Sequence, residues 1–149
     1  MLKELPNYSP EEFESQKHPF SIKRLSTTIG AELLDIDLKK DLSQEEKDHI
    51  YNALLTYKVI FFRDQDISTE QHMRFGQYFG ELEIHPFTPL GTNREDHAVV
   101  LRITHNEDNK PKENAWHSDV TWRMEPSLGS ILRMVETCLL YTSPSPRDS

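Results

Sequence analysis

The chain has 149 residues, of which 36% are hydrophobic and 28% are charged, a composition typical of a globular domain with a buried core. Its formal net charge of −8 argues against a nucleic-acid-binding surface, which needs clusters of basic residues. The sequence contains neither a long apolar stretch nor a secretory signal, so we expect a cytoplasmic protein without membrane or nucleic-acid partners.

The first part of the chain predicts an extension followed by two short strands. Residues 1–19 are polar and carry a cluster of glutamates, so we expect an N-terminal extension that is at most partly ordered. The apolar residues Phe20 and Ile22 alternate with polar ones, which predicts the start of a strand. A glycine at position 30 then indicates a turn into a second strand over residues 32–34.

A helix and a longer strand are predicted next. Ser43 and Glu46 have the spacing of a capping box, in which each side chain bonds the backbone amide of the other residue. Apolar residues recur behind them at helical intervals, so we expect a helix over residues 44–57 with its apolar side against the core. Residues 58–63 form a continuous apolar run with charged ends, which predicts a strand buried on both faces.

A second capping box, Ser68 with Gln71, predicts a helix over residues 69–79 that stops at Gly80. Beyond this helix the chain is expected to alternate between polar loops and short strands. The expected loops cover residues 81–91 and 104–113, and the expected strands lie around residues 98–103, 116–122 and 130–135.

The strand predicted around residue 117 carries a pair of side chains suited to binding a metal ion. His117 and Asp119 are two positions apart among β-branched and aromatic residues, so both are expected on one face of an extended chain. A neutral imidazole and a carboxylate are two of the three ligands of the facial triad that holds non-haem Fe(II). This spacing is common by chance, and His105 with Glu107 forms a rival pair in a polar loop.

The surroundings of this pair, together with three earlier stretches, resemble the taurine dioxygenase-like (TauD/TfdA) family of Fe(II)- and 2-oxoglutarate-dependent oxygenases. The resemblance covers about residues 20–137, and the four stretches occur in the family's order. They are Ile29-Gly30-Ala31-Glu32 with Asp35-Ile36-Asp37-Leu38, Val59-Ile60-Phe61-Phe62-Arg63-Asp64-Gln65, Phe79-Gly80-Glu81-Leu82 with Ile84-His85-Pro86, and Asn114-Ala115-Trp116-His117-Ser118-Asp119-Val120-Thr121-Trp122.

This resemblance implies an α+β fold, namely a double-stranded β-helix (jelly-roll) of the 2-oxoglutarate oxygenase type with the two predicted helices on its flank. Residues 20–137 would form the N-terminal part of this domain only. Residues 138–149 interrupt the family pattern and resemble the in-frame translation of a sequencing adapter. We therefore expect this tail to be foreign to the natural protein, which would be about twice as long as this chain.

The resemblance also implies the chemistry of the whole protein. It would be a dioxygenase with Fe(II) as cofactor and with 2-oxoglutarate and O₂ as co-substrates. It would hydroxylate a small organic anion that bears a sulfonate, sulfate or carboxylate group. His117 and Asp119 would be metal ligands, whereas the distal histidine ligand and the arginine that pairs with 2-oxoglutarate would lie in the missing C-terminal half of the natural protein. No residue of this chain is therefore assigned to 2-oxoglutarate, and homo-oligomerisation of the longer protein stays open.

Two further residues are expected in the substrate pocket. By resemblance, His85 would meet the anionic head group of the substrate, and Asn114 would supply a polar contact. Thr88 occupies a position where the taurine enzyme itself has an aromatic hydroxyl, which argues against taurine as the substrate. Two alternatives are a truncated, non-catalytic fragment and a metal-dependent hydrolase, although a hydrolase would leave the other three stretches unexplained.

Overall fold

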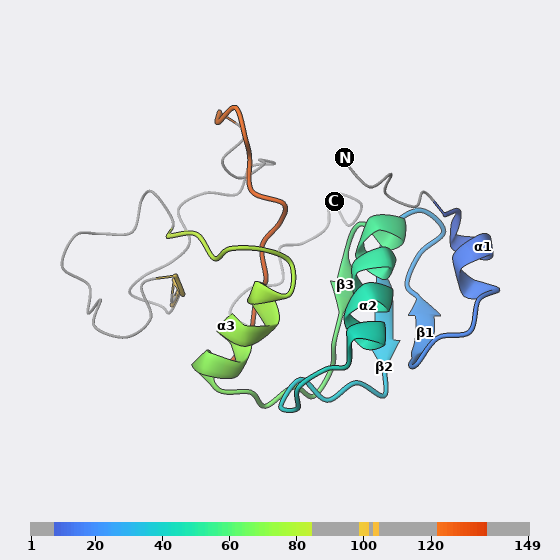
Figure 1. Ribbon diagram of the computed structural model, residues 1–149, viewed down its shortest axis with the longest axis horizontal. Helices are drawn as coiled ribbons and strands as arrows, with labels where there is room; N and C mark the ends of the chain where they lie inside the picture. Colours follow the sequence, from blue (N-terminus) through green and yellow to red (C-terminus); the bar gives the residue numbers. More distant parts are fainter. Residues whose placement is uncertain (1–7, 85–98, 102, 105–121, 137–149) are drawn as a thin grey trace, which may run out of the picture. The chain divides into compact units, whose positions relative to one another are not determined.

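The computed structural model describes residues 8–84, 99–101, 103–104 and 122–136 (Figure 1). The chain divides into two compact units, Met1–Leu82 and Glu83–Ser149. The helices and strands assigned in the described residues all belong to the first unit. They are α1 (Pro10–Glu14), β1 (Ser21–Arg24), β2 (Ala31–Leu34), α2 (Gln44–Tyr57), β3 (Ile60–Phe61) and α3 (Thr69–Gln77).

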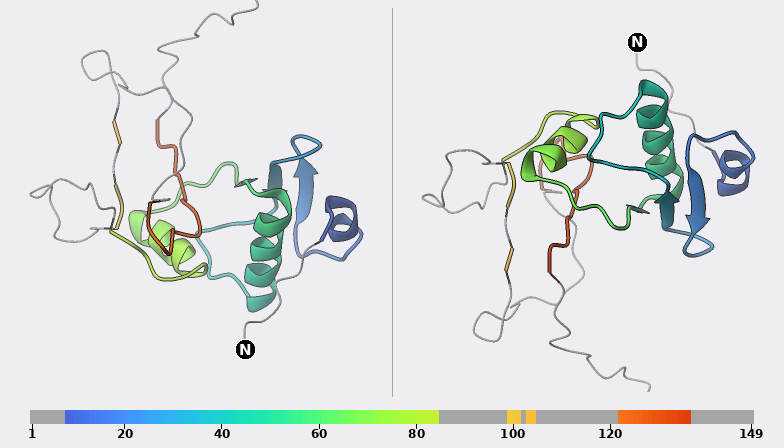
Figure 2. Two further views of the ribbon diagram at one scale, coloured as in Figure 1. Left: turned by 90° about the horizontal axis from the view of Figure 1, so that it is seen from above. Right: turned by 90° about the horizontal axis from the view of Figure 1, so that it is seen from below.

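The three strands form one mixed sheet in the order β1-β2-β3. The strands β1 and β2 are antiparallel, and their register runs from Ser21 opposite Leu34 to Arg24 opposite Ala31. The strands β2 and β3 are parallel, with Ala31 opposite Ile60, so a crossover must connect them. The helix α2 supplies this crossover, and both views of Figure 2 show it running alongside the sheet.

The core lies where α2 packs against one face of the sheet. Ile50, Ala53 and Tyr57 recur at helical spacing and are buried, as are Ala31 and Leu33 on β2. All five belong to one cluster of buried residues. Burying a large apolar side chain such as that of Ile50 or Leu33 is worth about 1.5–3 kcal/mol, so this face of the helix holds α2 on the sheet.

The short helix α1 adds an aromatic side chain to this core. Its cap is a complete capping box between Ser9 and Glu12, and proline occupies the first turn, where it is tolerated. Phe13 is fully buried, and its ring lies 6.0 Å from that of Tyr57 in an edge-on arrangement. Part of the polar segment expected as an extension is therefore packed on the core.

Side chains from later in the chain hold the connection from β2 to α2, and Gln65 and Arg74 make most of these bonds. The amide nitrogen of Gln65 donates to the carbonyl of Ile36 at 2.9 Å, and its oxygen accepts from the amide of Leu38 at 2.9 Å. Arg74 on α3 donates to three successive carbonyls, those of residues 38–40, and pairs with Asp41. These bonds satisfy backbone groups of a segment that forms neither a helix nor a strand and therefore lacks the hydrogen bonds of regular secondary structure.

The sequence predictions for the two longer helices are confirmed, with one change. The helix α2 has the expected bounds, and its Ser43–Glu46 capping box is present on both sides. The helix α3 ends at Gln77 rather than at residue 79. Its last turn tightens, because the amides of Tyr78 and Phe79 bond the carbonyls three residues earlier.

The prediction of a strand buried on both faces over residues 58–63 is wrong. Pairing is confined to Ile60–Phe61, and the side chains of Val59 and Phe61 are each 40% exposed. Positive φ angles at Lys58 (67°) and Asp64 (54°) limit the extended segment at both ends. Within the described residues β3 is the edge strand of the sheet, and α2 covers only one face of that sheet. A continuous run of apolar residues can therefore form a strand that is only partly buried.

Two other predicted strands are absent from the described residues. The described part of 98–103 and the whole of 130–135 form no regular strand. Most of their large apolar side chains are exposed, including Ile103 and Leu132. A strand is defined by its hydrogen-bonded partner, which an apolar sequence alone does not supply. Among the described helices none is long and apolar enough to span a bilayer.

Candidate functional site

The residues predicted from the sequence to form the site lie outside the described residues. This applies to the metal ligands His117 and Asp119 and to the substrate residues His85 and Asn114, and equally to the rival pair His105 and Glu107. In the part of the chain that the structure describes, no group of three or more His, Cys, Asp or Glu side chains could hold a metal ion. The described site therefore consists of the segments that flank these residues.

The flanking segments are joined by Glu83 in the second unit. The hydroxyl of Ser127 donates a 2.8 Å hydrogen bond to Oε2 of Glu83. The guanidinium of Arg123 forms an ion pair with Oε1 of the same carboxylate, and both side chains are about one-third exposed. Trp122 places its ring 5.3 Å from the Arg123 guanidinium, within cation–π range. One carboxylate thus connects two segments far apart in the sequence.

These contacts lie next to both predicted parts of the site. Glu83 stands two residues before His85, and Arg123 stands four residues after Asp119. The ion pair therefore joins two described residues that are close in sequence to the two predicted parts of the site. The sequence analysis missed Glu83 and Arg123. The sequence shows only that a charged residue lies near each of the two motifs. It does not show which of the charged residues form a pair.

A second charged cluster joins two of the stretches that carried the family resemblance. Glu32 on β2 is 7% exposed, and Arg63 donates from Nε to its Oε1 at 2.6 Å. Lys23 on β1 places Nζ 3.5 Å from Oε2. The hydrogen bond from Arg63, and then the charges of Arg63 and Lys23, lower the pKa of Glu32 against the opposing effect of burial. Glu32 is thus a satisfied structural carboxylate.

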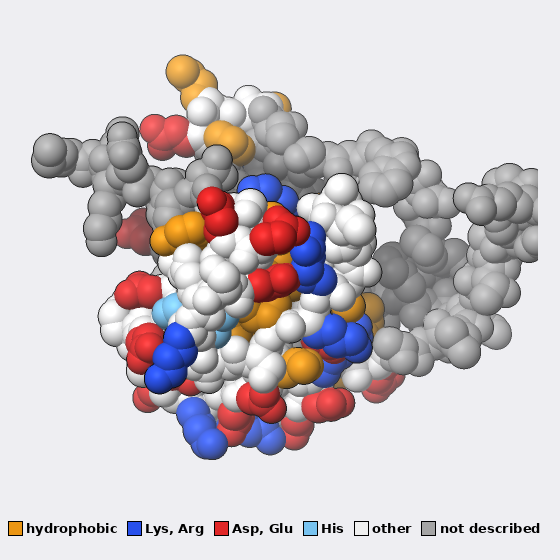
Figure 3. All heavy atoms as spheres, turned by 90° about the vertical axis from the view of Figure 1, so that its right-hand side faces the viewer, with side chains coloured by type: hydrophobic (Ala, Val, Ile, Leu, Met, Phe, Trp, Pro, Cys, Tyr) orange, Lys and Arg blue, Asp and Glu red, His pale blue; other side chains and the backbone are white. Residues whose placement is uncertain are grey.

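Two histidines of the first unit, His18 and His49, contact each other. His18 and His49 approach with their Nδ1 atoms 3.0 Å apart, and Nε2 of His18 lies 2.7 Å from the carbonyl of Phe13. If Nε2 of His18 donates to this carbonyl, its Nδ1 is free to accept from His49. Figure 3 shows acidic and basic side chains interspersed over the face it draws, as on an ordinary solvated surface.

Comparison with known proteins places these observations in a family. The family model described as "Taurine catabolism dioxygenase TauD, TfdA family" matches residues 21–138. This match covers most of the chain and includes all four stretches identified in the sequence. The chain belongs to the TauD/TfdA family of dioxygenases.

Several curated proteins are similar to the chain. It is 32% identical over 130 residues to an alpha-ketoglutarate-dependent sulfate ester dioxygenase of Pseudomonas putida, covering 85% of this chain and 39% of that protein. It is 29% identical over 102 residues to an alkylsulfatase of Acinetobacter baylyi, covering 68% and 31%. It is 26% identical over 124 residues to an alpha-ketoglutarate-dependent sulfonate dioxygenase of Saccharomyces cerevisiae, covering 77% and 30%.

The chain therefore spans between about a third and two fifths of the length of these relatives. Among solved structures, a taurine dioxygenase from Burkholderia xenovorans is 43% identical over 44% of this chain and 24% of that chain, with a TM-score of 0.43. The structure titled AAD-2 in complex with Mn(II) and N-oxalylglycine is 36% identical over 43% of this chain and 23% of that chain, with a TM-score of 0.42.

Proposed function

We propose that the chain is the N-terminal part of an Fe(II)- and 2-oxoglutarate-dependent dioxygenase that hydroxylates a small organic anion. The observation that carries this proposal is the family match over residues 21–138, which includes the pair His117 and Asp119. The names of three relatives specify sulfate esters, sulfonates and (S)-phenoxypropionate. What these compounds share is an anionic group on a small organic framework.

The donor atoms of His117 and Asp119 fit the metal that the family uses. Imidazole and carboxylate are two of the three protein ligands of a non-haem Fe(II) site, and their spacing suits a strand. Bound Fe(II), with 2-oxoglutarate and O₂, supplies the oxidising chemistry. The task of this chain's residues is to hold the metal and to orient the substrate beside it. The third ligand and the arginine for 2-oxoglutarate are proposed to follow in the longer protein.

Recognition of the substrate's anionic group is assigned to His85, with Asn114 as a second polar contact. A histidine can donate to a sulfate or carboxylate oxygen in its neutral form and adds charge when it is protonated. The bonds of Glu83 to Arg123 and Ser127 support this assignment, because they tie the segment before His85 to the segment after Asp119. The substrate residue and the metal ligands would then belong to one pocket.

The 149-residue chain by itself is proposed to be inactive. Two protein ligands bind a metal weakly and unselectively, and metal affinity depends on the full ligand count. The proposed division is an extension over residues 1–19, a partial oxygenase domain over 20–137 and a foreign tail over 138–149. The jelly-roll itself would be completed by the part of the domain that follows.

The proposal is tested with a longer protein, in which residues 1–137 are joined to the part of the P. putida relative that follows its matched segment. Alkyl sulfates, alkanesulfonates and aryloxy acids are supplied with Fe(II), 2-oxoglutarate and O₂. At least one class should be consumed only when all three are present. Sulfate release without O₂ or 2-oxoglutarate would instead establish a hydrolase.

A further inference from the structure

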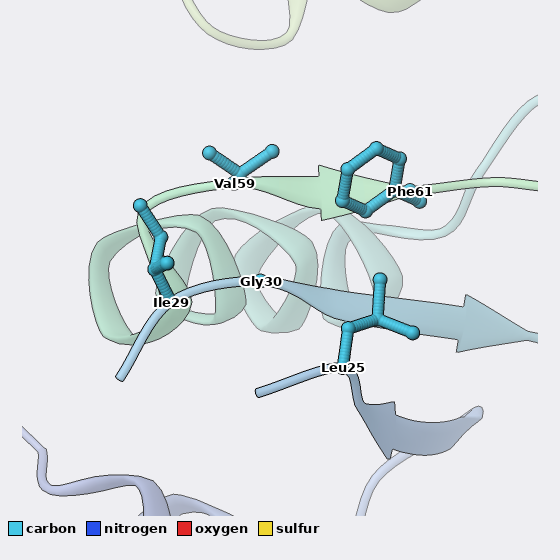
Figure 4. Close-up of a pocket in the computed structure, with 5 residues that line it drawn as sticks. All are labelled: Leu25, Ile29, Gly30, Val59 and Phe61. Carbon is cyan, nitrogen blue, oxygen red and sulfur yellow. The ribbon is translucent and has the colours of Figure 1, made fainter. Parts of the chain in front are cut away.

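Two features of the first unit are not among the residues proposed to form the site. One is a hollow of about 270 Å³, shown in Figure 4, whose lining is apolar and consists of Leu25, Ile29, Gly30, Val59 and Phe61. These side chains offer no polar group that could orient a ligand. The other feature is the contact between His18 and His49. Histidine is the side chain that ordinarily changes its charge between pH 5 and 8, so this contact can respond to pH.

The two histidines join the segment after α1 to the helix α2. His18 follows α1 in the chain, and His49 lies on α2. Both are half-buried among aromatic rings. The ring of Phe20 lies 5.9 Å from that of His18 and 6.4 Å from that of His49, and the ring of Phe13 lies 4.4 Å from that of His18. Since Phe13 and Phe20 are buried, they fix where the two imidazoles lie.

The contacts of His18 determine where the protons of the neutral pair lie. A carbonyl oxygen can only accept, so Nε2 of His18 carries a proton and donates it to the carbonyl of Phe13 at 2.7 Å. Two ring nitrogens 3.0 Å apart form a hydrogen bond only when one proton lies between them. Because neutral His18 has its single proton on Nε2, the donor between the two rings is Nδ1 of His49.

The pair can accept one more proton but not two. A first added proton enters at Nε2 of His49, whose Nδ1 still donates to His18, and the bond becomes charge-assisted. A second added proton places N–H groups on both Nδ1 atoms. Two donors on two positively charged rings then face each other across 3.0 Å, and this contact cannot persist. The two histidines therefore titrate as a pair, and only the fully charged state breaks it.

The charged groups around the pair do not remove this conflict. On α1, Glu11 and Glu14 already pair with Arg24 of β1, and Lys17 next to His18 adds positive charge. On α2, the charged residues within one turn of His49 are Glu45, Glu46, Lys47 and Asp48. The last three contact a cap amide, an aromatic ring and a glutamine, respectively. The remaining one is exposed, so that water and salt screen its charge.

We propose that His18 and His49 form a pH-sensitive clasp that holds α1 on the first unit and releases it when both imidazoles are charged. Release would separate the buried ring of Phe13 from that of Tyr57, which now lies 6.0 Å away. The ion pair of Glu11 with Arg24 is largely exposed and contributes little to holding α1 in place. Every contact in the proposal lies within residues 9–57, so it is independent of the assigned activity.

The first test locates the protons in the 149-residue chain by nitrogen-15 NMR of the imidazole rings. At pH 8 the proton of His18 should lie on Nε2 and that of His49 on Nδ1. A proton on Nε2 of His49 in the neutral pair would leave no hydrogen bond between the rings and would overturn the proposal.

The second test follows α1 while the pH is lowered from 8 to 4.5. The nuclear Overhauser effect between the rings of Phe13 and Tyr57 should be present at pH 8 and should disappear when both imidazoles become charged. The effect between the rings of Phe62 and Phe75, which are 5.3 Å apart in the same unit, should persist and thus show that the core is intact.

The variant His49→Asn separates the clasp from a general effect of acid. Its amide can donate to neutral His18 and can turn its oxygen toward charged His18, so α1 should stay in place down to pH 4.5. His97→Asn is the matched control and should release α1 as the unaltered chain does.

Four results of the second test would each overturn the proposal. The Phe13–Tyr57 effect could be absent from the unaltered chain at pH 8, or it could persist there with both imidazoles charged. The pair could take up only one proton down to pH 4.5. Finally, α1 could be lost equally in His49→Asn, or only together with the Phe62–Phe75 effect, which would show acid unfolding of the unit.

Discussion

The hydroxyl of Ser127 donates a 2.8 Å hydrogen bond to the carboxylate of Glu83, 44 positions earlier in the chain. The same carboxylate pairs with Arg123. Such a partly exposed pair contributes at most about 1 kcal/mol to stability, so its importance lies in position more than in energy. It joins the chain on either side of the residues proposed to bind metal and substrate.

Removing this link should affect substrate binding more than folding. In the longer protein, Glu83→Ala is expected to raise the KM for the prime substrate several-fold, because the segment carrying His85 is no longer held. The thermal midpoint should change little, and Fe(II) affinity should be retained. Glu81→Ala, a nearby acidic residue, serves as the control. An unchanged KM in Glu83→Ala would show that the link does not position the substrate segment.

The metal ligands are tested by separate replacement. His117→Ala and Asp119→Ala in the longer protein should each abolish Fe(II)-dependent turnover of 2-oxoglutarate, because loss of one of three ligands lowers affinity and opens the site to water. Binding of Fe(II) measured by calorimetry should fall in parallel. His105→Ala is the control and should retain both. Full turnover in the His117 and Asp119 variants would move the site elsewhere, with His105 and Glu107 as the next pair to test.

His85 should act on the prime substrate alone. A lost hydrogen bond to a charged group costs roughly 1.5–3 kcal/mol, so His85→Ala should weaken the apparent affinity for substrate by about one to two decades. Decarboxylation of 2-oxoglutarate in the absence of substrate should persist at nearly its original rate. His97→Ala is the matched control. If His85→Ala responds to substrate as the unaltered protein does, this histidine is an ordinary loop residue.

Glu32 gives a prediction about pH. Arg63 and Lys23 hold its pKa below the ordinary value of 4.5, so the folded state favours the charged carboxylate. The resulting stability is present above about pH 4.5 and is lost as the pH falls through the lowered pKa. Glu32→Gln should therefore be less stable at pH 7 and should lose less stability between pH 7 and pH 3, as measured by urea midpoints. Some dependence should remain, because the pKa values of Glu11 and Asp37 are lowered as well.

The control for this experiment is Glu45→Gln on the exposed side of α2, which should follow the pH profile of the unaltered chain. The same profile in Glu32→Gln would mean that the Arg63 contact does not contribute to stability in solution. The comparison needs no metal, co-substrate or longer protein, so it can be made with the 149-residue chain.

Features of the fold that depend on residues close together in the sequence could be predicted, and features that depend on distant residues could not. The helices α2 and α3 follow from Ser43 with Glu46 and Ser68 with Gln71, because a capping box acts within four residues. The same kind of signal was present at Ser9 and Glu12, and it was overlooked inside a segment judged by its polarity. Capping boxes were therefore sufficient to predict where a helix starts.

Long-range features could not be predicted in this way. Burial of residues 58–63 depends on which faces and edges of β3 are covered, and an apolar run carries no information about that. The pairings of Glu32 with Arg63 and of Glu83 with Arg123 join distant positions, and no periodicity marks them. His117, Asp119, His85 and Asn114 came from motif and family resemblance, and they remain predictions that the described residues do not test.

The central claim is tested most directly by release of labelled CO₂ from 2-oxoglutarate by the longer protein in the presence of Fe(II), O₂ and an alkyl sulfate or sulfonate. The account predicts release that requires Fe(II), matches the substrate consumed mole for mole and disappears in Asp119→Ala but not in Glu107→Ala. Consumption of substrate without CO₂ release, or release that persists in Asp119→Ala, would contradict the assignment of this chain to a 2-oxoglutarate-dependent dioxygenase with Asp119 at its metal.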